Sequence, residues 1–350
     1  MAGGTGGHIF PGIAVADELR ARGVPVVWLG GEVGLEGRLV PQAGIRMETL
    51  AFSGVRGKGI ATLLSAPLRL LRAVLAARRI LQKTSPRSVL SMGGYAAAPG
   101  GIAAWLARFP LIVHEQNRVP GFTNRLLARF ARKLLVGFSD AFPPGRAEWV
   151  GNPVRADIAA MSPPAERAAA RNGALRLLVI GGSQGAQILN TRVPAALAML
   201  PTSLHYDVRH QCGAKHTDSA RAAYAAVGVS ASVEPFIDDM VAAYAWADLV
   251  VCRAGALTIA ELAAAGLASV LVPFAAAVDD HQTRNAEALV TVGAARLLPE
   301  SVASVDRLSN LLTELGNNRG RLLAMATAAR TLAKPEATRR IADCCLEFAA

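Results

Sequence analysis

The sequence predicts an α/β fold with parallel sheets covered by helices. Short apolar runs bounded by Gly or Pro alternate with Ala- and Leu-rich segments of helical period, which is the pattern of repeated β-α-β units. Hydrophobic residues make up 52% of the chain and aromatic residues 5%, which favours helices packed on sheets over an aromatic-rich β-sandwich. At 350 residues the chain is much longer than a usual domain of roughly 150 residues, so two domains are expected.

Each half of the chain contains four candidate strands. They lie at 25–29, 88–92, 111–114 and 133–136 in the first half, and at 177–180, 206–210, 249–252 and 269–272 in the second. A boundary falls near Gly151-Asn152-Pro153, followed by a polar stretch that contains prolines. We therefore expect the first domain to span 1–152 and the second to begin at residue 153.

Each half also carries a glycine-rich turn that leads into a helix, at residues 3–8 and 181–186. Glycine lets a backbone approach a phosphate closely, and the following helix presents unpaired N–H groups at the positive end of its dipole. Neither turn matches the P-loop or the complete dinucleotide fingerprint, so each alone could be a simple tight turn. Their equivalent places in the two halves favour a pair of anion sites.

The first glycine turn lacks the strand that should precede it. An apolar run at 177–180 leads into the second turn, whereas only Met1 and Ala2 precede the first. In a doubly wound sheet this strand is normally central. We therefore expect that the N-terminal strand is missing, and that the natural polypeptide begins about ten residues upstream or has been truncated.

The net charge of +11 lies entirely in the first half. Residues 1–151 hold 19 Lys and Arg against 8 Asp and Glu, whereas residues 152–350 hold 18 of each. No acid occurs between Glu48 and Glu115, and residues 60–81 form an apolar helical stripe flanked by arginines. The stripe is first of all that of an ordinary domain helix, but its arginines in an acid-free region also suggest contact with an anionic lipid surface. No nucleic-acid partner is expected.

Composition excludes several other classes. The four cysteines show neither a CxxC nor a framework spacing, so neither a disulfide scaffold nor a zinc site is implied. The most apolar stretches, 95–113 and 254–278, are interrupted by prolines and charged residues and do not read as bilayer spans. No cofactor and no metal are expected.

The segment 253–261 follows a strand and opens a helix. Thr258 and Glu261 are three residues apart and share one face of its first turn. One interpretation is a capping box, Thr-x-x-Glu, which needs no ligand. The other places Thr258 and nearby amides on a phosphate and the carboxylate of Glu261 on ribose hydroxyls. The spacing alone favours neither.

The segment 279–285 follows another strand, at the sheet edge where open α/β sheets bind ligands. Its Asp-Asp-His run lacks a regular spacing of metal ligands. Recognition of sugar hydroxyls by Gln282 and Asn285 fits better, with an ordinary polar helix start as the alternative.

Two histidines are expected at the carboxyl edge of the first sheet. His8 begins the first helix, and His114 ends a strand within the run His114-Glu115-Gln116-Asn117. The positive end of a helix dipole favours a neutral imidazole that can accept a proton. A structural, hydrogen-bonded histidine fits the pattern equally well.

Taken together, the motifs resemble those of the MurG family of peripheral membrane glycosyltransferases. They run in the family's order from Gly3 to about Ala286 and read GGTGGHIFPGIAVA, SGVRGKG, MGGYAAAPGG, HEQNRVPG, VGNPVR, GGSQGA, FIDDM, CRAGALTIAELAAAG and DDHQTRNA. Members of this family transfer N-acetylglucosamine (GlcNAc) from UDP-GlcNAc to lipid I, the undecaprenyl-pyrophosphoryl-MurNAc-pentapeptide, and so form lipid II for peptidoglycan. The resemblance therefore implies a cell-wall transferase.

The fold implied by the resemblance is GT-B, in which two Rossmann-like domains face each other across a cleft. The first domain, 1–152, would hold lipid I and the membrane surface, and a C-terminal helix at 333–350 would return to it. The second, 153–332, would bind UDP-GlcNAc. The expected location is the cytoplasmic face of the bacterial cell membrane, as a peripheral protein.

The resemblance also implies a set of site residues. Those expected at the donor in the second domain are Arg155 and Ile237 near the uracil or its ribose, Ser183 and Thr258 at the diphosphate, Glu261 at the ribose and Gln282 at the sugar, together with Arg253, Ala256, Leu257, Ile259 and Ala260. Those expected to close the donor site from the first domain are Thr5, Gly6, Gly7 and Asn117. Those expected at the acceptor are Gly93, Gly94 and Tyr95, with His8.

The family reaction inverts the donor's α configuration, which suits a single displacement by the C4 hydroxyl of MurNAc. We expect His8 to act as the base, with Glu115 as the competing candidate, and helix N-terminal amides with Arg253 to stabilise the departing UDP. Two departures stand out: Ala254 replaces the serine common in the family's CRSGALT run, and the first strand is absent.

The sequence leaves two rival functions open. A UDP-GlcNAc 2-epimerase shares the architecture and the donor but needs no lipid, and the basic stretch of the first half argues against it. A truncated, inactive nucleotide-sugar-binding protein would bind the donor without turnover.

Overall fold

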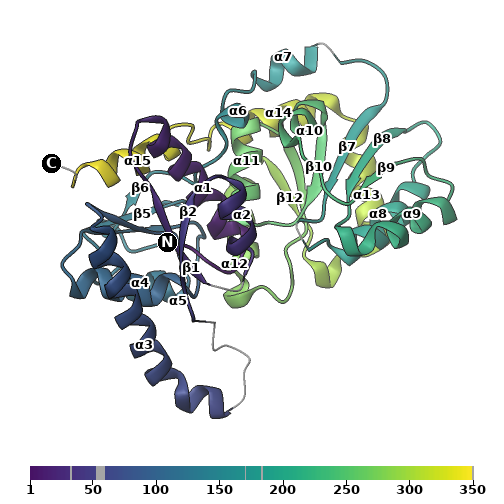
Figure 1. Cartoon of the computed structure of the whole chain (residues 1–350). Coiled ribbons are helices and arrows are strands. Elements are labelled where there is room, and N and C mark those ends of the chain that lie inside the picture. Colours follow the sequence, from purple (N-terminus) through teal and green to yellow (C-terminus); the bar gives the residue numbers. More distant parts are fainter. Residues whose placement is uncertain (32–33, 53–59, 170, 183, 349–350) are drawn as a thin grey trace. The chain divides into compact units, whose positions relative to one another are not determined.

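The computed structural model describes residues 1–31, 34–52, 60–169, 171–182 and 184–348, except the side chains of 60–64 and 278. The chain forms two compact units, Met1–Val154 with Glu336–Ala350, and Arg155–Pro335. In each unit, helices pack around parallel β-sheets (Figure 1). The predicted α/β class is confirmed.

In the first unit the strands form a two-stranded and a four-stranded parallel sheet, ordered β1-β2 and β3-β4-β5-β6. Their bounds are β1 Val27–Gly31, β2 Arg46–Leu50, β3 Val89–Ser91, β4 Leu111–Glu115, β5 Lys133–Val136 and β6 Glu148–Trp149. The four runs predicted in this half are confirmed. The strands β2 and β6 were not predicted, because β2 is largely half-exposed and β6 has only two residues.

No strand precedes the first helix, α1 (Gly6–Ala21), in the described residues. Instead Ala2 forms a single parallel bridge with Gly93. The backbone nitrogen of Met1 donates to the carbonyl of Leu90 at 2.7 Å, and the indole of Trp28 donates to the carbonyl of Ala2 at 3.1 Å. The turn that leads into α1 is thus held against both β1 and β3.

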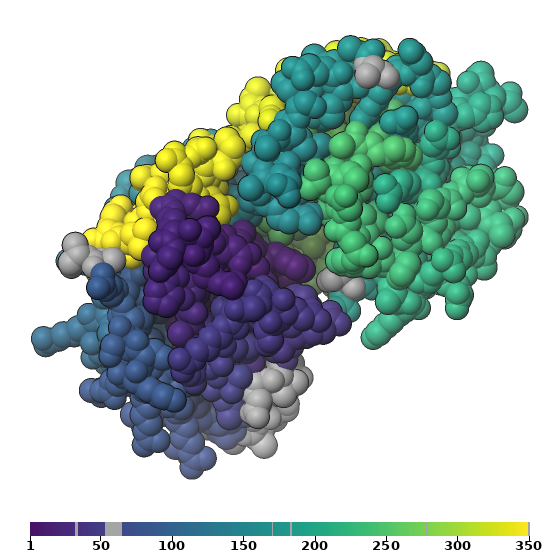
Figure 2. All heavy atoms as spheres, turned by 45° about the horizontal axis from the view of Figure 1, so that its top comes forward, coloured from purple at the N-terminus to yellow at the C-terminus, as the bar shows by residue number. Residues whose placement is uncertain are grey.

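The helices of the first unit are α1, α2 (Glu36–Gln42), α3 (Ile60–Thr84), α4 (Ala97–Leu106), α5 (Phe122–Leu127) and α15 (Ala337–Leu346). The C-terminal helix α15 packs against α1, where Val15 and Leu19 share an apolar cluster with Ile341 and Cys345. Figure 2 shows this yellow segment lying along the purple N-terminal one. Among the described residues, no helix combines the length and the apolar character needed to span a bilayer.

The second unit contains one six-stranded parallel sheet in the order β12-β11-β10-β7-β8-β9. The strands are β7 Leu175–Ile180, β8 Tyr206–Gln211, β9 Ser232–Glu234, β10 Leu249–Cys252, β11 Ala268–Leu271 and β12 Ala295–Leu297. The two strands missed by the sequence analysis are the three-residue edge strands β9 and β12. The four predicted strands are confirmed. Of these, β7, β10 and β11 are mostly apolar and form the buried centre, whereas β8 carries Asp207 and Arg209 and is partly exposed.

The helices of the second unit are α6 Ala156–Ala159, α7 Pro164–Ala169, α8 Gln187–Ala198, α9 Thr217–Ala226, α10 Met240–Trp246, α11 Ala256–Ala265, α12 His281–Thr291, α13 Val305–Gly316 and α14 Arg319–Arg330. The main core joins residues of β7 and β10 to leucines of α8 and α13. All four cysteines of the chain are free and buried, as expected for a chain without a disulfide framework.

Candidate functional site

In the sheet of the second unit, the order in which the chain adds strands reverses between β7 and β10. The chain first adds β8 and β9 on one side of β7, and then returns to place β10 and β11 on the other. Ligands of open α/β sheets bind outside the carboxyl ends of the strands at such a switch point. The glycine turn at 181–186 follows β7, and the segment 253–255 follows β10, so both predicted donor loops lie at this point.

The glycine turn after β7 has a backbone that other residues could not adopt. Gly182 and Gly185 have φ angles of +82° and +76°, and a Cβ at Gly185 would collide with the carbonyl oxygen of Cys212. Gln211 holds the turn, since its Oε1 accepts from the amide of Gly182 at 2.9 Å and its Nε2 donates to the carbonyl at 3.1 Å. The predicted contact of Ser183 lies outside the described residues.

The helix that follows this turn, α8, begins without a side-chain cap and has no acid in its first turn. The same is true of α11, whose N-cap is Gly255. Unpaired amides and a positive dipole end without a competing carboxylate suit an anion. The capping-box interpretation of Thr258 and Glu261 is wrong, because Thr258 is the third residue inside α11 rather than its cap.

The predicted donor residues on α11 differ in burial. Ala256 and Ile259 are buried in the unit, whereas Leu257, Thr258 and Ala260 are half-buried. Because β10 leads directly into α11, the backbone amides of the first turn of α11 lie at the switch point. The hydroxyl of Thr258 lies beside the N-cap, Gly255.

Glu261 lies one turn further along α11 and is joined to a buried tyrosine. The hydroxyl of Tyr244 donates to Oε2 of Glu261 at 2.9 Å. Burial raises the pKa of the Glu261 carboxyl, against the opposing effects of this hydrogen bond and of the Arg155 guanidinium. The structure thus brings Arg155 and Glu261 together, while Ile237 is buried nearer the end of β9.

Gln282 connects the loops after β10 and β11. Its Oε1 accepts from the amides of Phe274 at 2.9 Å and Ala254 at 3.3 Å, so this side chain joins the two loops. Asn285 is buried and donates to the carbonyl of Ala254 at 3.3 Å. Asn285 therefore supports the loop, and its expected contact with sugar hydroxyls stays a prediction.

Arg253 is committed to other protein groups. Its guanidinium pairs with both oxygens of Glu300, at 3.0 and 3.3 Å, and donates to the carbonyls of Val272 and Pro273, each at 3.1 Å. The contacts of Arg253 and of the Ala275 amide lower the pKa of Glu300 despite its partial burial. The expected direct role of Arg253 at a leaving group does not fit this arrangement, which leaves the helix amides as the available stabilising groups.

In the first unit, His8 is the half-buried third residue of α1, close to the end of β4. Its Nδ1 lies 2.7 Å from Oε1 of Gln116, whose Nε2 lies 2.9 Å from Nδ1 of His114. The structure therefore joins the two predicted histidines through a residue that the sequence analysis did not single out. Thr5 is the N-cap of α1 without a side-chain cap bond, and Gly6 and Gly7 form its first turn.

Glu115 does not have the geometry of a base. Its Oε1 accepts from the backbone and side-chain amides of Asn117, at 2.9 and 3.2 Å. Its Oε2 accepts from the amide of Gly121 at 3.0 Å and from Asn124 at 2.9 Å, and the residue is fully buried. A carboxylate that accepts four hydrogen bonds stabilises the conformation of this loop. The competing assignment of Glu115 as the base is therefore not supported.

The acceptor loops of the first unit are held together by Glu36, which the sequence analysis missed. Its Oε1 accepts from the hydroxyl of Tyr95 at 2.8 Å and from the amide of Gly31 at 3.2 Å, and its Oε2 from the amide of Gly4 at 3.2 Å. Desolvation and then this bond raise the pKa of Tyr95 to about 12. An acid at the start of a seven-residue helix carries no distinctive sequence signal.

Gly93 and Gly94, the other predicted acceptor residues, have φ angles of +98° and +85°. A Cβ at Gly94 would collide with the carbonyl oxygen of Gly3. The two glycine turns of the first unit are therefore in direct contact, which only glycine permits.

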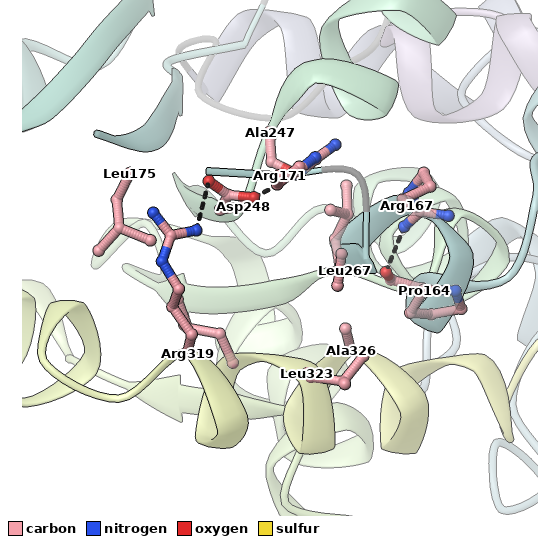
Figure 3. Close-up of a pocket in the computed structure, with 13 residues that line it drawn as sticks. Pro164, Arg167, Arg171, Leu175, Ala247, Asp248, Leu267, Arg319, Leu323 and Ala326 are labelled. Carbon is pink, nitrogen blue, oxygen red and sulfur yellow. Dashed lines mark hydrogen bonds and ion pairs between the residues drawn. The ribbon is translucent and has the colours of Figure 1, made fainter. Parts of the chain in front are cut away.

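The pocket drawn in Figure 3 lies elsewhere. It has a volume of about 80 Å³ and is lined by Leu175, Ala247 and Leu267, which mark the amino ends of β7, β10 and β11. Its polar wall is the ion pair of Arg171 with Asp248. This pocket is at the opposite sheet edge from the predicted donor loops and takes no part in the candidate site. No cluster of metal-ligating side chains occurs among the described residues.

Comparison with known proteins agrees with this geometry. Residues 1–136 match the glycosyltransferase family 28 N-terminal domain, and residues 176–341 match the family's C-terminal domain. The UDP-N-acetylglucosamine--N-acetylmuramyl-(pentapeptide) pyrophosphoryl-undecaprenol N-acetylglucosamine transferase of Xanthomonas campestris (strain 8004) is 62% identical over 349 residues, which are 100% of this chain and 81% of that protein.

Among solved structures, that of Acinetobacter baumannii MurG has a TM-score of 0.87 at 39% identity, covering 99% of this chain and 98% of the other. A UDP-N-acetylglucosamine 2-epimerase from Listeria monocytogenes has a TM-score of 0.66 at 14% identity, covering 97% and 92%, and shares the fold alone. The expected GT-B class is confirmed. The chain therefore belongs to glycosyltransferase family 28 and, within it, to the MurG family.

Proposed function

We propose that this protein transfers GlcNAc from UDP-GlcNAc to lipid I and so forms lipid II in peptidoglycan synthesis. The observation that carries the proposal is 62% identity to a curated transferase of this activity over the whole chain. The epimerase alternative has only the shared fold in its favour, at 14% identity.

The second unit would bind the donor at the switch point between β7 and β10. The uncapped N-termini of α8 and α11 would receive the diphosphate, with the hydroxyl of Thr258 as an added donor. The carboxylate of Glu261 would accept from the ribose hydroxyls, and Gln282 would donate its amide to the sugar. The positive ends of the helices would also stabilise the negative charge that UDP gains as it leaves.

The first unit would hold the acceptor, with its pyrophosphate at the paired glycine turns and the N-terminus of α1. His8 would take the proton of the MurNAc C4 hydroxyl as that oxygen forms a bond to C1 of GlcNAc. The bond from C1 to the phosphate oxygen breaks at the same time, and UDP leaves with its electron pair. A single displacement of this kind inverts the configuration at C1.

Transfer of labelled GlcNAc tests the proposal directly. With UDP-[14C]GlcNAc and a lipid I analogue, we expect label in a product of the mass of the lipid II analogue. Without the acceptor, we expect the donor to stay unchanged. Conversion of UDP-GlcNAc alone into UDP-ManNAc would instead establish the epimerase, and donor binding without any product would establish the inactive binding protein.

We further propose that α3 attaches the protein peripherally to the inner face of the cell membrane. Leu68, Leu71 and Leu75 are 52%, 55% and 47% exposed and share one face of the helix. The exposed Arg72 and Arg79 adjoin them, and residues 65–84 contain no acid. An apolar stripe bordered by cations is suited to the interface of an anionic bilayer.

The double substitution of Leu71 and Leu75 by Ser should weaken binding to vesicles containing phosphatidylglycerol by about 10-fold or more, because it removes much of the apolar area available for burial. Co-sedimentation measures this. Met199→Ser, at a residue of the second unit that is 54% exposed, is the matched control and should bind as the unsubstituted protein does. Equal binding of the double variant would contradict the assignment of α3.

A further inference from the structure

A line of hydrogen bonds runs from His8 into the interior of the first unit and ends on a backbone carbonyl. His8 Nδ1 contacts Gln116 Oε1 at 2.7 Å, Gln116 Nε2 contacts His114 Nδ1 at 2.9 Å, and His114 Nε2 contacts the carbonyl of Gly151 at 2.9 Å. His114 and Gln116 are buried, whereas His8 is half-buried. One end of the line is therefore sealed in the core and the other reaches the predicted acceptor site.

The direction of these bonds follows from the groups at the buried end. A carbonyl oxygen can only accept, so Nε2 of His114 carries a hydrogen and donates to Gly151. Desolvation lowers the pKa of His114 to about 4, so the ring is neutral near pH 7 and its Nδ1 has a lone pair. Gln116 must then present its NH₂ group to His114.

A second contact gives the same orientation of Gln116 independently. Its Nε2 also lies 3.0 Å from the carbonyl oxygen of His114, which can only accept. The backbone of Gln116 is held as well, because Asn152 donates to its carbonyl at 3.0 Å. The amide oxygen of Gln116 is therefore the atom that faces His8.

An amide oxygen cannot donate, so the hydrogen in the bond to Gln116 belongs to Nδ1 of His8. A neutral imidazole carries one hydrogen, and the lone pair of His8 must then be on Nε2. Within the described part of the chain, this nitrogen forms no hydrogen bond. Without the amide oxygen of Gln116 opposite Nδ1, a neutral His8 could carry its hydrogen on either ring nitrogen.

We propose that Gln116 and His114 are positioning residues that hold His8 in the tautomer whose Nε2 accepts the proton of the acceptor hydroxyl. This inference rests on the proposed function, in which His8 is the base. As the glycosidic bond forms and UDP departs, the hydroxyl proton passes to Nε2 and His8 becomes an imidazolium. Its Nδ1–H still donates to Gln116, so the chain of bonds needs no rearrangement during the reaction. The added proton is then lost to water.

The tautomer can be observed without any substitution. Long-range ¹⁵N–¹H correlation spectra distinguish the two neutral forms of histidine, and the signals of His8 are identified by their loss in His8→Ala. At about pH 8 we expect the Nδ1–H form at His8 in the otherwise unchanged protein. The Nε2–H form would overturn the inference.

Two substitutions of Gln116 test the consequence for turnover. Gln116→Leu removes the acceptor opposite His8, so we expect a large share of the Nε2–H form and a fall in kcat of roughly 10- to 100-fold, part of what a positioned base contributes. The Kd of UDP-GlcNAc should stay within about twofold, since only the proton acceptor changes. Gln116→Glu keeps an acceptor oxygen opposite His8, so it should keep the Nδ1–H tautomer and more of the turnover than Gln116→Leu. Its second oxygen would face the Nδ1 and carbonyl acceptors of His114, so we expect it to be less stable than the unsubstituted protein.

The outcomes separate this inference from the proposed function. Unchanged kcat in folded Gln116→Leu, or a shifted tautomer without loss of kcat, would overturn the positioning role. If His8 shows the Nδ1–H form but His8→Ala retains turnover, the assignment of His8 as the base fails, and the positioning role fails with it. A merely structural Gln116 would lower stability in both variants without changing the tautomer, which thermal unfolding and the spectra together would reveal.

Discussion

Replacing His8 by Ala should lower kcat by roughly 10²- to 10⁴-fold, because this is the usual contribution of a general base to proton transfer. The affinity for UDP-GlcNAc should stay unchanged, since the donor loops belong to the second unit. Steady-state transfer to a lipid I analogue gives kcat, and titration calorimetry with UDP-GlcNAc gives the Kd.

His205→Ala is the matched control for this experiment, because His205 is an exposed histidine of the second unit. It should retain full turnover. Near-normal turnover in His8→Ala would remove His8 from the chemistry. Glu115 would not take over as the base, since each of its two carboxylate oxygens already accepts two hydrogen bonds from the loop that it stabilises.

Glu261→Gln should weaken UDP-GlcNAc binding by about 10- to 100-fold, because a hydrogen bond to a charged group contributes about 1.5–3 kcal/mol. Gln keeps the shape of the side chain and an oxygen that can accept from Tyr244. The change therefore removes the charge that would face the ribose hydroxyls while leaving the internal contact in place. Calorimetry of donor binding measures the effect.

The same substitution should raise the stability of the protein at pH 7. The pKa of Glu261 is raised by burial, so the folded state holds this proton more tightly than the unfolded chain does. The contribution of Glu261 to stability is therefore full below its unfolded pKa of about 4.3 and is lost as pH rises through the raised value. Gln does not ionise, and the melting temperature of the variant should exceed that of the unsubstituted protein at pH 7 more than at pH 4.

A carboxylate that weakens the fold and strengthens ligand binding has a functional role. Lower stability of Glu261→Gln at pH 7 together with unchanged donor affinity would show that Glu261 only supports Tyr244. Tyr244→Phe is the matched control, because it removes the internal hydrogen bond but keeps the carboxylate.

The central strands of both units could be predicted from the sequence, because a strand covered on both faces must be apolar along its length. The run at 249–252 is apolar throughout and the run at 111–114 is apolar up to Val113, and β4 and β10 are completely buried. The edge strands β2, β6, β9 and β12 could not be predicted, since they are short or half-exposed and depend on a neighbouring strand for their hydrogen bonds.

The candidate site was predicted in part. Glycine turns and helix starts depend on backbone geometry that is local in sequence, and the segments at 3–8, 181–186 and 253–261 all proved to be such places. Glu36 and Gln116 escaped prediction, because their partners are remote in the chain. Gly4 lies 32 residues from Glu36, and His8 lies 108 residues from Gln116.

By itself, the sequence determined the α/β class, the two halves, the glycine turns and the family, since each of these follows from patterns read along the chain. Only the tertiary structure decided which polar side chains are available to substrates and which stabilise the loops around the site. It committed Glu115 to its loop, Arg253 to Glu300 and Asn285 to a carbonyl, and it left His8 at the open end of a chain of hydrogen bonds. The physical reason is that a hydrogen bond depends on position and direction in space, which residue type and spacing along the chain do not specify.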